Sequence, residues 1–98
     1  MKNILPPIHP GEILREEYLT PLNLSSGALA KKLGVPRTRI ERLTKEKTPI
    51  STDTALRLAK YFKTSAQFWM NMQTGYDLKI EKKAKAKELN SIPTMDVA

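Results

Sequence analysis

The stretch SSGALAKKLGVPRTRIERLTKE, residues 25–46, decides the fold. Ser25 is a good N-cap for a first short helix, and Gly34 is placed to end that helix in the left-handed conformation. A second helix begins almost at once, with Pro36 in its first turn. Two short helices joined by a turn of three or four residues that contains glycine are typical of a helix-turn-helix. The side chains expected to face the core are Leu29, Ala30, Leu33, Ile40 and Leu43.

The outer face of the second helix is basic. With about 100° between successive residues, Thr38 and Arg42 lie on the side opposite the inward-facing Ile40. Arg37 lies in the first turn, which is the part of a recognition helix that meets base edges. The turn spacing alone also fits an ordinary helical hairpin, and the arginines favour DNA binding. The predicted base contacts are therefore Arg37, Thr38 and Arg42.

Other polar side chains around this helix are predicted to contact the DNA backbone. Arg39 projects sideways, where it is better placed for a phosphate than for the floor of the groove. The N-terminus of the first helix offers free N–H groups to an anion. Glu41 stands four residues from both Arg37 and Lys45, so we expect it to orient these cations rather than to read a base. The predicted backbone contacts are Ser26, Arg39, Lys45, Lys47 and Thr48.

The composition favours a polyanionic partner and excludes several classes of protein. The chain has 98 residues, with 17 Lys and Arg against 10 Asp and Glu, and a formal net charge of +7. Because it has no cysteine and a single histidine, disulfide scaffolds, thiol catalysis and cysteine or histidine metal clusters are excluded. We find no convincing acid–base or nucleophile constellation, so we expect neither enzymatic activity nor a cofactor.

Neither a membrane span nor a leader is expected. No apolar run approaches the roughly 20 residues that a transmembrane helix needs. The opening residues MKNILPPIHPGE lack the long apolar core of a signal peptide. The sequence therefore predicts a small basic protein of the cytoplasm.

Three further helices complete an all-α, five-helix domain over residues 1–89, and no strand is predicted. One helix precedes the central pair, where Pro10 suits its first position and Pro21 is expected to end it. Another follows the pair, because residues 55–62 repeat apolar side chains at i, i+3, i+4 and i+7.

The last helix is predicted to begin at a capping box, in which Thr64 stands three residues before Gln67. Its first half is apolar, and its second half, over residues 79–88, is rich in lysine. Residues 90–98 contain Pro93 and show no periodicity, so we expect them to form a flexible tail.

A dimer surface is also expected. A single helix-turn-helix reads few bases, and such proteins usually bind as two-fold dimers on half-sites about 34 Å apart. The last helix carries more large apolar groups than one face can bury. We expect Phe68 to close the core of the monomer. Trp69 and Met72 suit either the core or an interface, and we assign both to a dimer interface formed through this C-terminal helix.

Six short motifs occur together in the chain: HPGEILREE at 9–17, LA at 29–30, LGV at 33–35, ALRLA at 55–59, FWMNMQ at 68–73 and YDL at 76–78. In combination they resemble the HigA-type antitoxins of the lambda-repressor-like (Xre) helix-turn-helix class. The resemblance covers about residues 8–80. It implies a lambda-repressor-like dimer that neutralises a RelE-like ribonuclease toxin and represses its own operon through a palindromic operator in double-stranded DNA.

The chain departs from the family pattern at three places. The family commonly has Ser or Thr near Pro36-Arg37, so the operator sequence does not follow from the resemblance. It also commonly has Asn-Gly near residues 45–47, where this chain lacks the glycine that would end the recognition helix cleanly. Gly75 stands where alanine is usual.

An acidic patch near the N-terminus suggests where such a toxin would bind. A protein that cleaves nucleic acid is expected to be basic. Residues 1–20 carry a net negative charge although the whole chain is positive. Charge complementarity would steer a basic partner to this patch, although glutamates also favour a helix N-terminus. The predicted toxin contacts are Glu12, Glu16 and Glu17.

Two other functions stay open on the sequence. The same fold serves stand-alone transcriptional repressors that have no toxin partner. A pure protein inhibitor, in which the helix-turn-helix only packs, would not need the basic outer face of the second helix.

Overall fold

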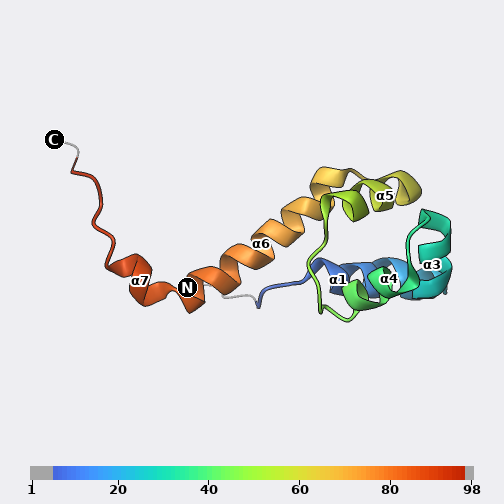
Figure 1. Ribbon diagram of the computed structural model, residues 1–98, viewed down its shortest axis with the longest axis horizontal. Helices are drawn as coiled ribbons and strands as arrows, with labels where there is room; N and C mark the ends of the chain where they lie inside the picture. Colours follow the sequence, from blue (N-terminus) through green and yellow to red (C-terminus); the bar gives the residue numbers. More distant parts are fainter. Residues whose placement is uncertain (1–5, 97–98) are drawn as a thin grey trace.

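The computed structural model describes residues 6–96, and every regular element in this range is helical (Figure 1). The prediction of an all-helical fold is confirmed. The elements are α1 (Pro10–Ile13), the π-helical η1 (Leu14–Leu19), α2 (Thr20–Leu22), α3 (Ser26–Leu33), α4 (Arg37–Thr44), α5 (Thr52–Phe62), α6 (Ala66–Ala84) and α7 (Ala86–Asn90).

The first three elements follow one another as a single helix over residues 10–22. Pro21 lies inside this helix, so the prediction that it ends the helix is wrong. A proline ring normally clashes with the carbonyl four residues earlier. The π-helical turn just before it, in which the N–H of Thr20 bonds to the carbonyl of Arg15, is wider and accommodates the ring. The helix ends at Asn23, which takes the left-handed conformation with φ 53°.

One apolar core joins the helices. All the inward-facing residues predicted for the helix-turn-helix are buried. The helix α1–η1–α2 covers them from one side through Leu14, and α5 and α6 cover them from the other side through Leu58 and Trp69. The buried apolar residues are Leu14, Leu19, Leu29, Ala30, Leu33, Ile40, Leu43, Ile50, Ala55, Leu58 and Trp69.

Trp69 corrects the predicted dimer interface. Its side chain is 0% exposed, so it belongs to the core of the monomer, whereas Phe68, expected in that core, is 39% exposed. The centroids of the Trp69 and Tyr18 rings lie 5.2 Å apart. The Nε1 of Trp69 donates to Thr64 Oγ1 at 2.9 Å. Met72 is half-buried against the same core, so only part of its side chain is available to another chain.

The start of α6 is shifted by one residue from the prediction. The N-cap is Ser65, whose Oγ accepts from the backbone N–H of Phe68 at 3.0 Å. Thr64 is therefore free to accept from the indole of Trp69. Adjacent residues of a helix point about 100° apart, so Phe68 and Trp69 cannot both face the core, and in this protein Trp69 does.

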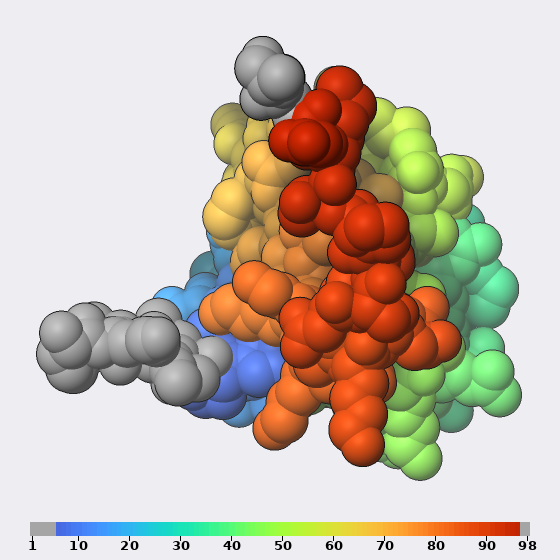
Figure 2. Space-filling model, turned by 90° about the vertical axis from the view of Figure 1, so that its left-hand side faces the viewer, coloured from blue at the N-terminus to red at the C-terminus, as the bar shows by residue number. Residues whose placement is uncertain are grey.

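The C-terminal part of the chain projects from the body. Figure 1 shows α6 leaving the other helices and leading to α7, and Figure 2 shows this segment in front of the body when the molecule is viewed from that end. Every residue from Asp77 to Asp96 is exposed. The predicted single lysine-rich helix is interrupted at Lys85, between α6 and α7. The projection gives the molecule its length of 56 Å, against 26 and 23 Å in the other directions.

The N-terminus of α1 packs directly against the end of α4. His9 caps α1, because its Nδ1 accepts from the N–H of Gly11 at 2.9 Å. A Cβ atom added at Gly11 would lie 1.8 Å from the carbonyl oxygen of Leu43. Two backbones therefore meet here at a distance that only glycine permits. Burial lowers the pKa of His9 below its ordinary value, while Glu46 opposes that shift.

Replacement of Gly11 by alanine is therefore expected to lower the free energy of unfolding by about 3 kcal/mol, because α1 must move away from α4. Gly75→Ala is the matched control, since a Cβ atom there meets nothing within 4 Å. In a helix interior that change should stabilise the protein by roughly 0.5–1 kcal/mol. Urea denaturation measures both. Equal effects of the two substitutions would contradict the close contact.

Candidate nucleic-acid interface

α4 is fixed in the fold along its inner side and at both ends. Ile40 and Leu43 hold its inner side in the core. At its start, Gly34 takes the left-handed conformation with φ 73°, and the N–H of Val35 bonds to the carbonyl of Ala30 at 3.0 Å. At its end, the guanidinium of Arg15 donates to the carbonyl of Thr44. The direction of the outer face is therefore set by the core.

The three residues predicted to contact bases lie on this outer face. Arg37, Thr38 and Arg42 are all exposed. The Nε of Arg37 lies 3.2 Å from Oε2 of Glu41, as predicted, whereas within residues 6–96 no ion pair joins Glu41 to Lys45. Among residues 6–96, Arg42 has no carboxylate within ion-pair distance. Its charge is thus available to an anionic ligand.

Arg39 lies at the edge of this face and is paired with α5. Its Nη1 lies 2.5 Å from Oδ2 of Asp53, and the same oxygen accepts from Nε of Arg57 at 3.0 Å. The bonds from these two guanidinium groups lower the pKa of Asp53 below its ordinary value. Two cations share one carboxylate, so this side of α4 keeps a net positive charge.

The segment after α4 carries the remaining predicted phosphate contacts. Lys45 and Lys47 are exposed and Thr48 is half-buried. Glu46 between them takes the left-handed conformation with φ 61°. Its carboxylate lies 3.3 Å from Nη2 of Arg15. The chain turns after α4 without a glycine, and backbone hydrogen bonds close the turn: the N–H of Glu46 bonds to the carbonyl of Leu43 and the N–H of Lys47 to the carbonyl of Arg42, both at 2.9 Å.

The N-terminus of α3 lies beside the end of α4. Ser25 caps it as predicted, since its Oγ accepts from the N–H of Ala28 at 3.0 Å. Ser26 is half-buried, and its Oγ lies 3.4 Å from Oγ1 of Thr44. Ser26 therefore links the two helices of the motif as well as standing at an anion-attracting helix end.

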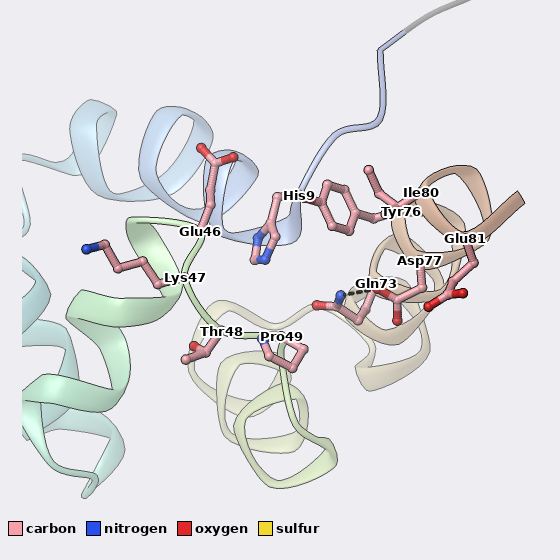
Figure 3. Close-up of a pocket in the computed structure, with 10 residues that line it drawn as sticks. All are labelled: His9, Glu46, Lys47, Thr48, Pro49, Gln73, Tyr76, Asp77, Ile80 and Glu81. Atoms are coloured by element: carbon pink, nitrogen blue, oxygen red, sulfur yellow. Dashed lines mark hydrogen bonds between the residues drawn. The ribbon is translucent and has the colours of Figure 1, made fainter. Parts of the chain in front are cut away.

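The side of the segment 46–49 that faces α6 is acidic. A groove of about 550 Å³ separates the segment 46–49 from α6 (Figure 3). Three carboxylates and one lysine line it, and on its floor Gln73 Oε1 accepts from the N–H of Ile50 at 2.7 Å. Phosphates would be repelled from the carboxylates of α6, and the Lys47 side chain extends away from them (Figure 3). The charged residues that line it are Glu46, Lys47, Asp77 and Glu81.

Sequence reasoning missed two residues that hold the interface. Arg15 fastens the end of α4, and Arg57 donates from Nη1 to the carbonyl of Leu33 at 2.8 Å, just before the turn. Their partners are 24 to 31 residues away in the chain. No local spacing could reveal them.

Within residues 6–96, no three His, Cys, Asp or Glu side chains come together in a way that could hold a metal ion. In the same range, none of the helices has the length and apolar character required to cross a bilayer.

The helix-turn-helix family matches residues 14–69 of the chain. Antitoxin HigA-1 of Vibrio cholerae is 33% identical over 74% of the chain and 68% of its own length. The chain belongs to the HigA-type helix-turn-helix family. Virulence-associated protein I of Dichelobacter nodosus is 57% identical over 86% of the chain and 78% of its own length.

A solved HigA structure has the same fold. The Pseudomonas aeruginosa antitoxin HigA, solved with the higBA promoter, is 44% identical to the chain and superposes with a TM-score of 0.89. The match covers 92% of this chain and 99% of that one. The HigA-type fold thus extends beyond the helix-turn-helix and includes most of the C-terminal projection.

Proposed function

We propose that this protein is an antitoxin that binds the operator of its own operon as a dimer and neutralises a RelE-like ribonuclease toxin. The observation that carries the DNA-binding part is that Arg37, Thr38 and Arg42 are all exposed on α4, whose inner side is held in the core by Ile40 and Leu43. The HigA of Pseudomonas aeruginosa, which shares this fold, was solved with its promoter. The antitoxin part is supported by the same family membership.

We assign contacts with bases and contacts with phosphates to different residues on and around α4. Arg37, Thr38 and Arg42 reach base edges from the outer face of α4 in the major groove. Phosphates are bound near the end of α4, by the N-terminus of α3 and by the segment after α4, and at the edge of α4 by Arg39. The proposed backbone contacts are Ser26, Arg39, Lys45, Lys47 and Thr48.

Arg42→Ala and Lys47→Ala test this division. Loss of Arg42 should weaken binding to DNA from upstream of the gene by about 1–3 kcal/mol, and weaken binding to random DNA much less. Loss of Lys47 should weaken binding to both DNAs alike and reduce the salt slope of binding by about one. Fluorescence anisotropy over a range of salt concentrations measures both. Identical behaviour of the two variants would contradict the assignment.

The C-terminal projection is the proposed dimer surface. It exposes several large apolar side chains, which cost free energy in water unless another surface covers them. A second copy related by a two-fold axis would cover them and would present two α4 helices to a palindromic operator. Met72 adds its exposed part at the base of the projection. The exposed apolar residues are Leu78, Ile80, Leu89, Ile92 and Met95.

A variant that carries Ile80→Lys and Leu89→Lys should therefore be a folded monomer with poor affinity for upstream DNA. Leu22→Lys is the matched control, because Leu22 is an equally apolar residue, 59% exposed, on α2. The control should remain a dimer. Sedimentation velocity gives the oligomeric state and circular dichroism checks the fold. An intact dimer in the double variant would place the interface elsewhere.

The acidic patch on the first helix is the proposed toxin surface. Glu16 and Glu17 are exposed, and Glu12 is half-buried. Glu16 pairs with Arg15 at 2.9 Å, so part of its charge is compensated within the chain. The patch belongs to a different helix from the base-reading residues. A basic toxin would be steered to it while α4 remains available to DNA.

Reversal of charge at both positions, Glu16→Lys with Glu17→Lys, should slow association with the protein encoded beside this gene at low salt, without loss of DNA binding. Glu88→Lys with Asp96→Lys makes the same change in net charge outside the acidic groove and serves as the control, and sedimentation velocity checks that this variant keeps the oligomeric state of the wild type. Stopped-flow association rates compare them. If both double variants slow association equally, the effect is one of net charge and the patch is not the contact. If no neighbouring protein binds the wild type, the protein is a stand-alone repressor.

A further inference from the structure

Arg37 is the first residue of α4, and the stem of its side chain lies against the start of α3. A Cβ atom added at Gly27, the second residue of α3, would lie 2.9 Å from Cδ and 3.5 Å from Cγ of Arg37. Real Cβ atoms are essentially never found as close as the first of these distances. The guanidinium group beyond this stem is exposed, since the Arg37 side chain is 72% accessible.

Glu41 holds the same side chain through its guanidinium group. The ion pair joins Glu41 Oε2 to Nε of Arg37 at 3.2 Å. A contact through Nε leaves the two terminal nitrogens free, and these are the atoms that arginine uses for a forked contact with guanine. Arg37 is thus restrained at its stem and at Nε, while the part that would read a base remains free.

We infer that Gly27 and Glu41 are positioning residues that determine which base Arg37 reads. The inference rests on the proposed DNA-binding function. Neither residue is required to touch DNA: Gly27 provides room for the stem of Arg37, and Glu41 fixes the direction of its guanidinium plane.

The backbone at Gly27 offers no other reason for a glycine. Of the glycines within residues 6–96, Gly34 alone has positive φ, so Gly27 has a conformation that any residue can adopt. Glycine in a helix is less stable than alanine. An alanine at this position would meet a flexible side chain rather than backbone. Gly27→Ala should therefore displace Arg37 and leave the fold intact.

The test is selection from a random duplex library by the full-length wild type and by three variants, Gly27→Ala, Glu41→Gln and Arg37→Ala. Affinities are then measured for the selected site and for the same site with each base pair changed. Gly27→Ala and Glu41→Gln should each lose about tenfold in discrimination, at the same base pair at which Arg37→Ala loses it. Gly27→Ala should melt at or above the temperature of the wild type. If Gly27 had only a structural role, Gly27→Ala would lower the melting temperature and leave the discrimination between base pairs unchanged.

A double-mutant cycle measures how strongly Gly27 and Glu41 act through Arg37. In the Arg37→Ala background, Gly27→Ala and Glu41→Gln should change discrimination by less than about twofold, because the side chain that they position is absent. If either substitution still alters discrimination in that background, or leaves it unchanged in the wild type, the inference is wrong. If the wild type selects no sequence at all, the proposed DNA-binding function fails and this inference fails with it.

Discussion

The contact between the backbone of Gly11 and the carbonyl of Leu43 is the constraint on which the arrangement of the molecule depends. It brings the N-terminus of α1 against the last turn of α4, at a separation that leaves no room for a side chain. From this position the same helix places Arg15 over the end of α4, where it bonds to the carbonyl of Thr44 and to Glu46. The recognition helix is therefore held from a part of the chain about 30 residues away.

The chain turns after α4 without glycine. A left-handed residue with a side chain is strained, and at Glu46 two backbone hydrogen bonds to the last turn of α4 hold this conformation, while its carboxylate lies 3.3 Å from Nη2 of Arg15. The departure from the family pattern near residues 45–47 is thus accommodated by the turn at Glu46. On the other side of α4, Asp53 and Arg57 connect α5 to the carbonyl of Leu33 and brace the turn.

Charge is divided between the faces of the molecule. The outer face of α4 and the segment after it carry exposed cations, whereas Glu16 and Glu17 are exposed on the first helix. Phosphate and a basic protein would therefore be attracted to different surfaces. In the proposed function, this separation would let DNA and a basic toxin bind at different surfaces of the molecule.

Local patterns predicted the helices and the core of the helix-turn-helix correctly. The positions of Leu29, Gly34 and Ile40 follow from spacing and from the conformational freedom of glycine, which act within a few residues. The exchange of roles between Phe68 and Trp69 could not be predicted in this way, because adjacent residues differ by about 100° and the choice depends on Tyr18 and Thr64.

The position of Pro21 inside a helix could not be predicted from local patterns either. It depends on a π-helical turn that no residue in the sequence marks. The ion pairs of Arg15 and Arg57 were missed because their partners lie far away in the chain. What the sequence could not provide is therefore the set of long-range contacts that fix the direction of α4.

The most direct test of the account is a titration of isotope-labelled protein with its upstream DNA, followed by the backbone amide signals in nuclear magnetic resonance spectra. The largest changes should occur at residues 26–28 and 37–45, while Gly11 and the core retain their signals because the anchored helix binds as a rigid unit. Changes concentrated in the lysine-rich residues 79–87, with α4 unaffected, would contradict the claim that the outer face of α4 is the surface that reads DNA.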